Sequence, residues 1–291
     1  MAKKALLIGI NYIGTSNRLN GCANDMLAMR QELQKNGYTD ITLISDDYAR
    51  ANYTPSRENI LAQLRKIVDN AQPGDEIFFH YSGHGSYTRD LNADEPDGRD
   101  ETICAISDGE ITDITDDELK KILQNLPYGV KLAAIMDCCH SASVFDLKNN
   151  IDKPTTKITT ERPHGYTVML SGCQDNQTSA DAFLSGKYQG AMTASFLAEV
   201  KKNGFKSVLD TLYSNSRSQL TKLRTSLYSW LRTNSFVQKP DISYEGLLPK
   251  SVPVLPSYRA AQSRYPLRQT QARQEREHQY KEMHAPLLKL A

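Results

Sequence analysis

Residues 132–143 read "LAAIMDCCHSAS", an apolar run that ends in two adjacent cysteines followed by small residues. Residues 76–86, "EIFFHYSGHGS", have the same organisation, with a histidine near the end of the run. Short apolar runs of this kind are typical of buried parallel strands. Reactive groups in open α/β sheets gather at the carboxyl ends of such strands. We therefore expect two adjacent strands with a site at their tips.

Apolar runs of strand length alternate with segments of helical spacing along most of the chain. The expected strands are 4–10, 40–45, 76–82, 101–107, 131–137, 166–172 and 239–246. The expected helices are 24–37, 56–74, 115–126, 190–204 and 207–223, the second capped by Ser56. This alternation predicts an α/β fold, with a mostly parallel central sheet covered by helices on both faces.

Composition narrows the class of protein. The 291 residues are 39% hydrophobic, which is enough to form a buried core. The net charge is +1, so we expect no overall positive potential that would attract nucleic acid or an acidic membrane. No run of eighteen apolar residues could span a membrane. The five cysteines are odd in number and lack a CxxC pair, which predicts reduced thiols in the cytoplasm. We expect a monomer.

The chain divides into a main domain and an extension. Residues 1–246 carry the alternating pattern, interrupted by a polar, Pro-containing connection at 147–164 that we expect to be exposed. Residues 247–291 are Pro-rich and then basic and polar, typical of a solvated tail or a surface helix. A partner site in this extension is the alternative.

Alternation along the strands selects one cysteine. Side chains in a strand point to opposite faces with period two, so Asp137 and Cys139 share a face while Cys138 points the other way, under a helix. The same alternation puts Ser82 and His84 on one face. We therefore expect His84 and Cys139 to lie side by side.

Such a pair suits a thiol nucleophile. A nearby imidazole can deprotonate the thiol and later protonate a leaving amine. The backbone N–H groups of Gly85 and Cys139 are candidate donors to the oxyanion of a tetrahedral intermediate.

The other cysteines and histidines have plainer interpretations. Single cysteines are usually small buried hydrophobes, which we expect of Cys22, Cys104 and Cys173. His80 lies inside an apolar run and is expected to be a core histidine, and His140 to orient its loop.

The two stretches resemble the His and Cys motifs of the metacaspases, a family of caspase-like cysteine peptidases. "LNGCANDM", "DGRDETI", "ITDDEL" and "SGCQDNQTSADA" resemble other signature stretches of that family, and the similarity runs from about Lys4 to Gly246. The resemblance implies a caspase-like three-layer sandwich with His84 and Cys139 as the catalytic dyad. The resemblance is to the catalytic core of the type I-like members, and we expect this core to lack an N-terminal prodomain.

Acidic residues near the nucleophile indicate the substrate. Asp137 shares its face, and Asp25 begins a helix after the first strand. An acid pair favours an Arg or Lys side chain before the scissile bond. The resemblance implies a basic-specific pocket lined by Cys22, Asp25, Ser82 and Asp137. The alternative for Asp25 is a helix N-terminal acid that interacts with the dipole.

Acidic loops raise the question of a metal. Residues 90–101 partly fit an EF-hand loop, but Glu95 replaces the required glycine and Pro96 follows, so this assignment fails. Similarity to calcium-dependent metacaspases implies Ca²⁺ as cofactor, with the ligands Asp100, Asp116, Asp117 and Asp146. In the alternative, Asp116 and Asp117 only cap the following helix.

The function expected from the sequence is a calcium-dependent cysteine endopeptidase that cuts protein or peptide substrates after Arg or Lys, with self-cleavage. One alternative is a catalytically silent scaffold of the same fold that binds partners. Another is a related thiol peptidase or transpeptidase with a different specificity.

Overall fold

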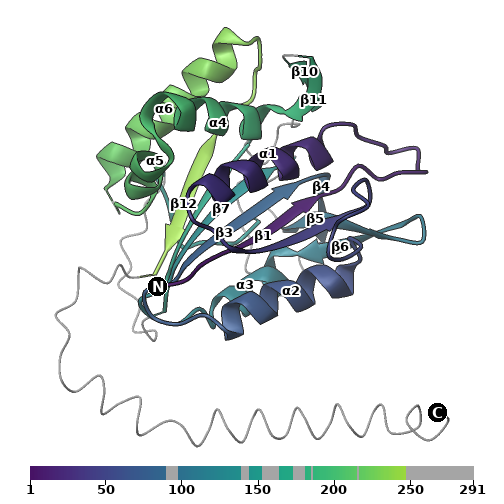
Figure 1. Cartoon of the computed structure of the whole chain (residues 1–291), viewed down its shortest axis with the longest axis horizontal. Coiled ribbons are helices and arrows are strands. Elements are labelled where there is room, and N and C mark those ends of the chain that lie inside the picture. The colour runs from purple at the N-terminus through teal and green to yellow at the C-terminus, as the bar shows by residue number, and fades with distance from the viewer. Residues whose placement is uncertain are drawn as a thin grey trace, which may run out of the picture. The chain divides into compact units, whose positions relative to one another are not determined.

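A seven-stranded sheet forms the centre of the fold (Figure 1), in the order β2-β1-β3-β7-β9-β12-β8. Its strands are β1 (Lys3–Gly9), β2 (Asp40–Ser45), β3 (Glu76–Ser82), β7 (Lys131–Asp137), β8 (Asn149–Asn150), β9 (Tyr166–Ser171) and β12 (Asp241–Glu245). The five strands from β2 to β9 pair in parallel, whereas β12 and β8 are antiparallel additions at one edge. The mostly parallel sheet predicted from the sequence is confirmed.

The computed structural model describes residues 1–89, 98–138, 144–152, 164–172, 181–184, 186–214 and 216–246, all of them in one compact unit, Met1–Pro249. The predicted extension 247–291 and the middle of the predicted connection, 153–163, lie outside these ranges. The expectation that the whole connection is exposed is wrong for its first residues, because Asn149 and Asn150 pair with the central sheet and Ile151 is 1% exposed. None of the helices within these ranges combines the length and apolarity needed to cross a bilayer.

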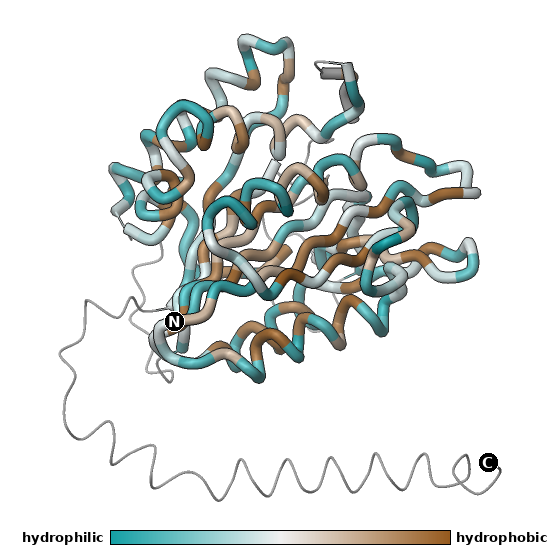
Figure 2. Tube along the Cα trace, in the orientation of Figure 1, coloured by the Kyte–Doolittle hydropathy of each residue, from teal (hydrophilic) through white to brown (hydrophobic). Residues whose placement is uncertain are grey.

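Helices cover both faces of the sheet (Figure 1). The helices α1 (Cys22–Lys35), α4 (Ala191–Asn203), α5 (Phe205–Leu212) and α6 (Arg217–Thr233) lie on one face, and α2 (Arg57–Asp69) and α3 (Asp116–Leu123) on the other. Each face has its own apolar core. Figure 2 shows the apolar residues concentrated in the central strands, as expected for strands buried on both faces. The predicted three-layer arrangement is confirmed.

Two small antiparallel units stand apart from the central sheet. One is a three-stranded sheet of β4 (Gly85–Arg89), β5 (Arg99–Ser107) and β6 (Glu110–Thr115), and the other is a hairpin of β10 (Asp181–Leu184) and β11 (Lys187–Gly190). The predicted strand 101–107 is therefore real but belongs to the smaller sheet. Its partners β4 and β6 are short and largely exposed, so no apolar run marks them.

The structure corrects two predicted helices. The expected helix 207–223 is two helices, α5 and α6, because Ser216 accepts a hydrogen bond from the backbone N–H of Gln219 and starts a new helix there. The expected helix 56–74 begins where predicted, with Ser56 as the cap, but ends at Asp69. The chain then turns toward Gly74, which has a positive φ of 97°.

Candidate active site

His84 lies one residue beyond Gly83, in the step from the end of β3 to the start of β4. The two neighbouring strands β3 and β7 are parallel and in register, with Ser82 opposite Asp137. The backbone N–H of Gly83 still donates to the carbonyl of Asp137, at 3.3 Å. His84 is thus presented at the carboxyl end of the sheet, and the chain leaves β7 toward position 139 at the same end.

A backbone carbonyl orients the imidazole of His84. Its Nε2 atom lies 2.7 Å from the carbonyl oxygen of Asn17, in the loop after β1. A carbonyl oxygen can only accept a hydrogen bond, so Nε2 carries the proton. In the neutral ring, Nδ1 is then the atom that can take a proton from a substrate or a nucleophile. Residue types alone do not predict this contact, because it uses the backbone of Asn17.

Of the two adjacent cysteines, Cys138 is fully buried in the core beneath α2 and α3. It faces the same side of the sheet as Met136, as the alternation predicts. Cys139 and His140 lie outside the described residues, as does Cys173. Cys22 and Cys104 are 5% exposed, which confirms their predicted burial.

Three of the predicted pocket residues meet on the opposite face. The Ser82 hydroxyl donates to Asp25 Oδ2 at 2.8 Å, and Asp25 is fully buried. The backbone N–H of Gly190, at the end of the β10–β11 hairpin, donates to the same oxygen at 2.8 Å. A Cβ on Gly190 would lie 2.2 Å from Asp137 Oδ2 and 2.8 Å from Asp25 Oδ2. The two carboxylates therefore flank Gly190.

The N-terminus of α4 contributes to this acidic pair. The backbone N–H of Thr193, in its first turn, donates to Asp137 Oδ2 at 2.7 Å. Backbone donors and the helix dipole at this position favour a negative charge on the carboxylate. Asp25 is itself in the first turn of α1, as the simpler interpretation required, but its carboxylate also reaches across to Ser82 and Gly190.

Cys22, the fourth predicted pocket residue, begins α1 one turn before Asp25. Asn11, which is 1% exposed, fixes this end of the helix through its side-chain Oδ1, which accepts from the backbone N–H of Cys22 at 2.9 Å. The Asn11 backbone N–H donates to Asp46 and its side-chain amide to Asp47, both at 2.8 Å. The loop after β2 thus holds the loop after β1.

His80 lies behind the pocket and is a core histidine, as predicted. It is fully buried, and its Nε2 lies 3.0 Å from the hydroxyl of Thr193. Burial lowers the pKa of His80 to about 3, so the ring is neutral.

Of the four predicted calcium ligands, Asp100 and Asp116 lie close enough to interact electrostatically. Asp100 and Asp116 are buried, and Asp116 Oδ2 accepts from the backbone N–H of Glu101 at 3.3 Å. Burial, together with the negative charges of Glu101 and Asp100, raises the pKa of Asp116 to about 7. The helix cap itself is made by Thr115 and Glu118 in a capping box. Asp116 is therefore not the residue that caps α3.

Asp146, the fourth predicted ligand, forms an ion pair with Lys120 of α3. Asp117 follows Asp116, and its backbone N–H donates to Asp116 Oδ1 at 2.8 Å. Among the residues that the structure describes, no three acids, histidines or cysteines are arranged to hold a metal ion. The set has only hard oxygen donors, the type that Ca²⁺ prefers.

Solved structures identify the class of this fold. A crystal structure of a Geobacter sulfurreducens protein matches with a TM-score of 0.59 at 24% identity, covering 88% of this chain and 98% of that one. Caspase-1 from Spodoptera frugiperda matches with a TM-score of 0.50 at 10% identity, covering 85% and 87%. The architecture is therefore that of the caspase-like α/β proteins.

Sequence comparisons then identify the family. Residues 3–148 match the family described as "Metacaspase, peptidase C14 domain". Metacaspase-1 of Schizosaccharomyces pombe is 35% identical over 77% of this chain and 67% of the relative. Metacaspase-1 of Ajellomyces capsulatus is 35% identical over 76% of this chain and 77% of the relative. The chain belongs to the metacaspase family of cysteine peptidases.

Proposed function

We propose that the protein is a cysteine endopeptidase with His84 as the base and Cys139 as the nucleophile. The main support is the register of β3 and β7, which brings the chain ends before His84 and Cys139 to the same sheet edge. The Asn17 contact supports the same assignment, because it leaves Nδ1 of His84 as the proton acceptor.

In this mechanism His84 Nδ1 takes the proton from the Cys139 thiol, and the thiolate sulfur attacks the carbonyl carbon of the substrate. The C=O electrons move to oxygen, and the oxyanion is held by the N–H groups of Gly85 and Cys139. The imidazolium then protonates the leaving amine as the C–N bond breaks. A water molecule hydrolyses the remaining thioester and restores the thiol.

The antiparallel ladder supports Gly85 as an oxyanion donor. The backbone N–H of Cys104 donates to the carbonyl of His84 at 3.1 Å, so His84 and Cys104 belong to a hydrogen-bonded pair. Hydrogen-bonded and non-bonded pairs alternate along an antiparallel ladder. The next pair, Gly85 and Ile103, is then of the non-bonded kind, with the N–H of Gly85 directed away from β5.

The acid pair supports specificity for Arg or Lys before the scissile bond. Asp25 and Asp137 converge beside the carboxyl ends of β1, β3 and β7, and each carboxylate is held by a backbone N–H. A buried anionic pair of this kind selects a cation by charge and rejects an acidic side chain, because like charges in a low dielectric repel strongly. An Arg side chain could bind both carboxylates through its planar fork.

Calcium is part of the proposal as an activating ion. Burial, together with the negative charges of Glu101 and Asp100, raises the pKa of Asp116, and a hard cation bound here would offset both the burial of the carboxylate and the repulsion between the acids. Asp117 and Asp146 would complete the ligand set. Ligation of Asp146 requires Lys120 to release it, so binding would rearrange the segment that follows Cys139.

Reporter peptides ending in Arg, Lys or Asp test the proposal. The parent protein with calcium should cut the Arg and Lys peptides and leave the Asp peptide intact. Cys139→Ala should be inactive, whereas Cys138→Ser should retain activity if it folds, because Cys138 is buried on the other face. Equal loss in both folded variants would contradict the dyad, and cleavage of the Asp peptide would contradict the pocket.

A further inference from the structure

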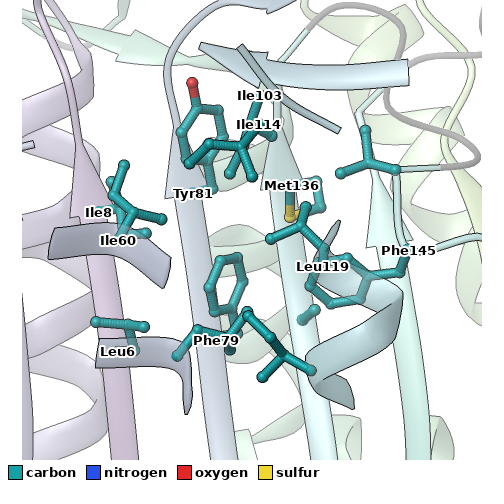
Figure 3. Close-up of a cluster of buried hydrophobic side chains, with 14 of the residues drawn as sticks. Leu6, Ile8, Ile60, Phe79, Tyr81, Ile103, Ile114, Leu119, Met136 and Phe145 are labelled. Carbon is teal, nitrogen blue, oxygen red and sulfur yellow. The ribbon is translucent and has the colours of Figure 1, made fainter. Parts of the chain in front are cut away.

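Two buried tyrosines meet beneath His84. Tyr12 lies in the loop after β1, Tyr81 lies in β3, and both are fully buried. Their hydroxyl oxygens are 3.0 Å apart. Figure 3 shows the ring of Tyr81 inside the core, with its hydroxyl directed away from Phe79. Two tyrosine hydroxyls so deep in a core need hydrogen-bond partners.

The partners are the peptide groups of His84 and Cys104. The N–H of His84 donates to the Tyr12 hydroxyl at 2.8 Å, and that hydroxyl donates to the carbonyl of Cys104 at 2.8 Å. The N–H of Cys104 lies 3.2 Å from the Tyr81 hydroxyl, whose shortest contact is the carbonyl of His84, at 2.7 Å. The Cys104 N–H also donates to the His84 carbonyl at 3.1 Å, so its proton is shared between that carbonyl and the Tyr81 hydroxyl. Because each hydroxyl has one proton and two acceptor positions, these contacts link the backbone of His84 to that of Cys104 in a closed ring of hydrogen bonds, here called the hydroxyl ring.

The hydroxyl ring replaces part of the backbone hydrogen bonding that would otherwise extend the β4–β5 ladder. β4 and β5 pair from Gly85 and Ile103 onward, and the preceding pair is His84 and Cys104. A regular pair would exchange two direct backbone hydrogen bonds. Here only the bond from Cys104 to His84 is direct, and the Tyr12 hydroxyl is inserted into the other. The hydroxyls therefore set how far the backbone of His84 stands away from β5.

Two backbone features accompany this arrangement, a positive φ at Tyr12 and a glycine at position 83. Tyr12 has a φ of 53°, in the left-handed region that bulky residues avoid. A Cβ on Gly83 would lie 2.6 Å from the Tyr81 hydroxyl oxygen and 3.0 Å from that of Tyr12. Only glycine fits at position 83 beside the two hydroxyls. This explains the first glycine of the "SGHGS" stretch.

Tyr12 also supports the imidazole ring directly. Its ring centroid lies 4.5 Å from that of His84, with the two planes tilted by 39°. The same loop provides the Asn17 carbonyl that binds Nε2. Burial raises the pKa of both tyrosine hydroxyls well above the usual value, so they stay protonated when a thiol peptidase would act.

We infer that Tyr12 and Tyr81 are positioning residues for His84, whose backbone they fix through the hydroxyl ring and whose imidazole Tyr12 supports. This inference rests on the proposed role of His84 as the catalytic base. A displaced imidazole would transfer the proton less effectively while the acidic pocket still bound the substrate. The two residues should therefore act on kcat and leave KM nearly unchanged.

The kinetic test uses Tyr12→Phe, Tyr81→Phe and the double variant, which keep both aromatic rings. Tyr166→Phe is the matched control, because Tyr166 is also fully buried but its hydroxyl contacts the Leu212 carbonyl, at 3.4 Å, in the other core. We expect kcat to fall about tenfold or more in each single variant, with KM within about twofold of the parent. The double variant should lose little more than one single variant, because either change opens the same ring.

A second measurement does not depend on activity. Nitrogen NMR of ¹⁵N-histidine-labelled protein, in the Cys139→Ala background, reports the tautomer of His84. We expect the Nε2–H form alone with both tyrosines present, and a mixture of tautomers in Tyr12→Phe and Tyr81→Phe.

Unchanged His84 signals in both variants, or a loss of kcat no larger than in Tyr166→Phe, would overturn the inference. A parent that folds and cuts no peptide would contradict the proposed peptidase function instead. In that case the NMR result still decides whether the tyrosines position His84.

Discussion

Replacing Gly190 by alanine places a methyl group between the two carboxylates of the proposed pocket. The new Cβ would lie 2.2 Å from Asp137 Oδ2 and 2.8 Å from Asp25 Oδ2, so the first contact must lengthen by more than about 1 Å to become ordinary. Gly190 has φ −69° and ψ 139°, which any residue adopts, so backbone strain adds nothing. The effect comes from displaced carboxylates alone.

The size of the effect follows from the hydrogen bond that holds Asp137. Moving its carboxylate by about 1 Å breaks the 2.7 Å contact with the N–H of Thr193. A hydrogen bond to a charged group contributes about 1.5–3 kcal/mol. If that amount is lost from binding of the transition state, kcat/KM for an Arg peptide falls about 10- to 150-fold.

The assay compares kcat/KM for an Arg reporter peptide in the parent, in Gly190→Ala and in Lys187→Ala. Lys187 is an exposed residue of the same hairpin, so its variant controls for effects of the hairpin alone. Thermal unfolding of all three proteins separates a local change from loss of the fold. A Gly190→Ala protein with parental kcat/KM would show that the flanking carboxylates do not bind the basic side chain.

Three further outcomes are expected. Self-cleavage should occur after basic residues in 153–163 and not after Lys148, because Glu245 holds both the backbone N–H and the ammonium group of Lys148. Intact mass measures it, with Cys139→Ala as the control, and a cut after Lys148 would contradict this prediction. The hydrogen bond to Glu245 raises the pKa of His164, so its stabilisation is complete below its unfolded-chain pKa of about 6.5 and is lost as pH rises through the raised value. Denaturant titrations should show His164→Gln less stable than the parent at about pH 5.5 and equal to it at about pH 9, and an equal deficit at both would refute the coupling. Lys120→Met should lower the calcium midpoint of peptidase activity, because the competing cation beside Asp146 is gone; an unchanged midpoint would remove that aspartate from the ligand set.

The central strands could be predicted because burial on both faces leaves a strong apolar signal. β3 and β7 begin and end at the predicted residues, and their register supports the expected meeting of the chain segments that follow them. β4 and β6 could not be predicted in the same way, since their residues are mostly exposed and their pairing with β5 is set by tertiary contacts.

The site also has a part that could be predicted and a part that could not. Asp25 and Asp137 could be named because a pair of carboxylates suits the recognition of a cation, and Ser82 could be named through the resemblance to the metacaspases. The groups that hold them, at Gly190 and Thr193, are backbone N–H donors from more than fifty residues away in sequence. Such backbone donors cannot be predicted from the residue types, because every residue except proline has a backbone N–H.

The anchoring of the loop after β1 by Asn11 has a consequence for how this scaffold can diverge. Asn11 fixes the start of the loop on Asp46 and Asp47 and its end on Cys22, and the Asn17 carbonyl lies between those two points. An insertion in this loop would therefore alter the tautomer of His84, the proposed base, and one wall of the proposed pocket together. The β10–β11 hairpin holds Asp25 through the backbone N–H of Gly190, so changes to the exposed side chains of the hairpin leave this contact in place. Those side chains are where a designer, or natural variation, could change the substrate choice of the proposed peptidase without altering the proposed base.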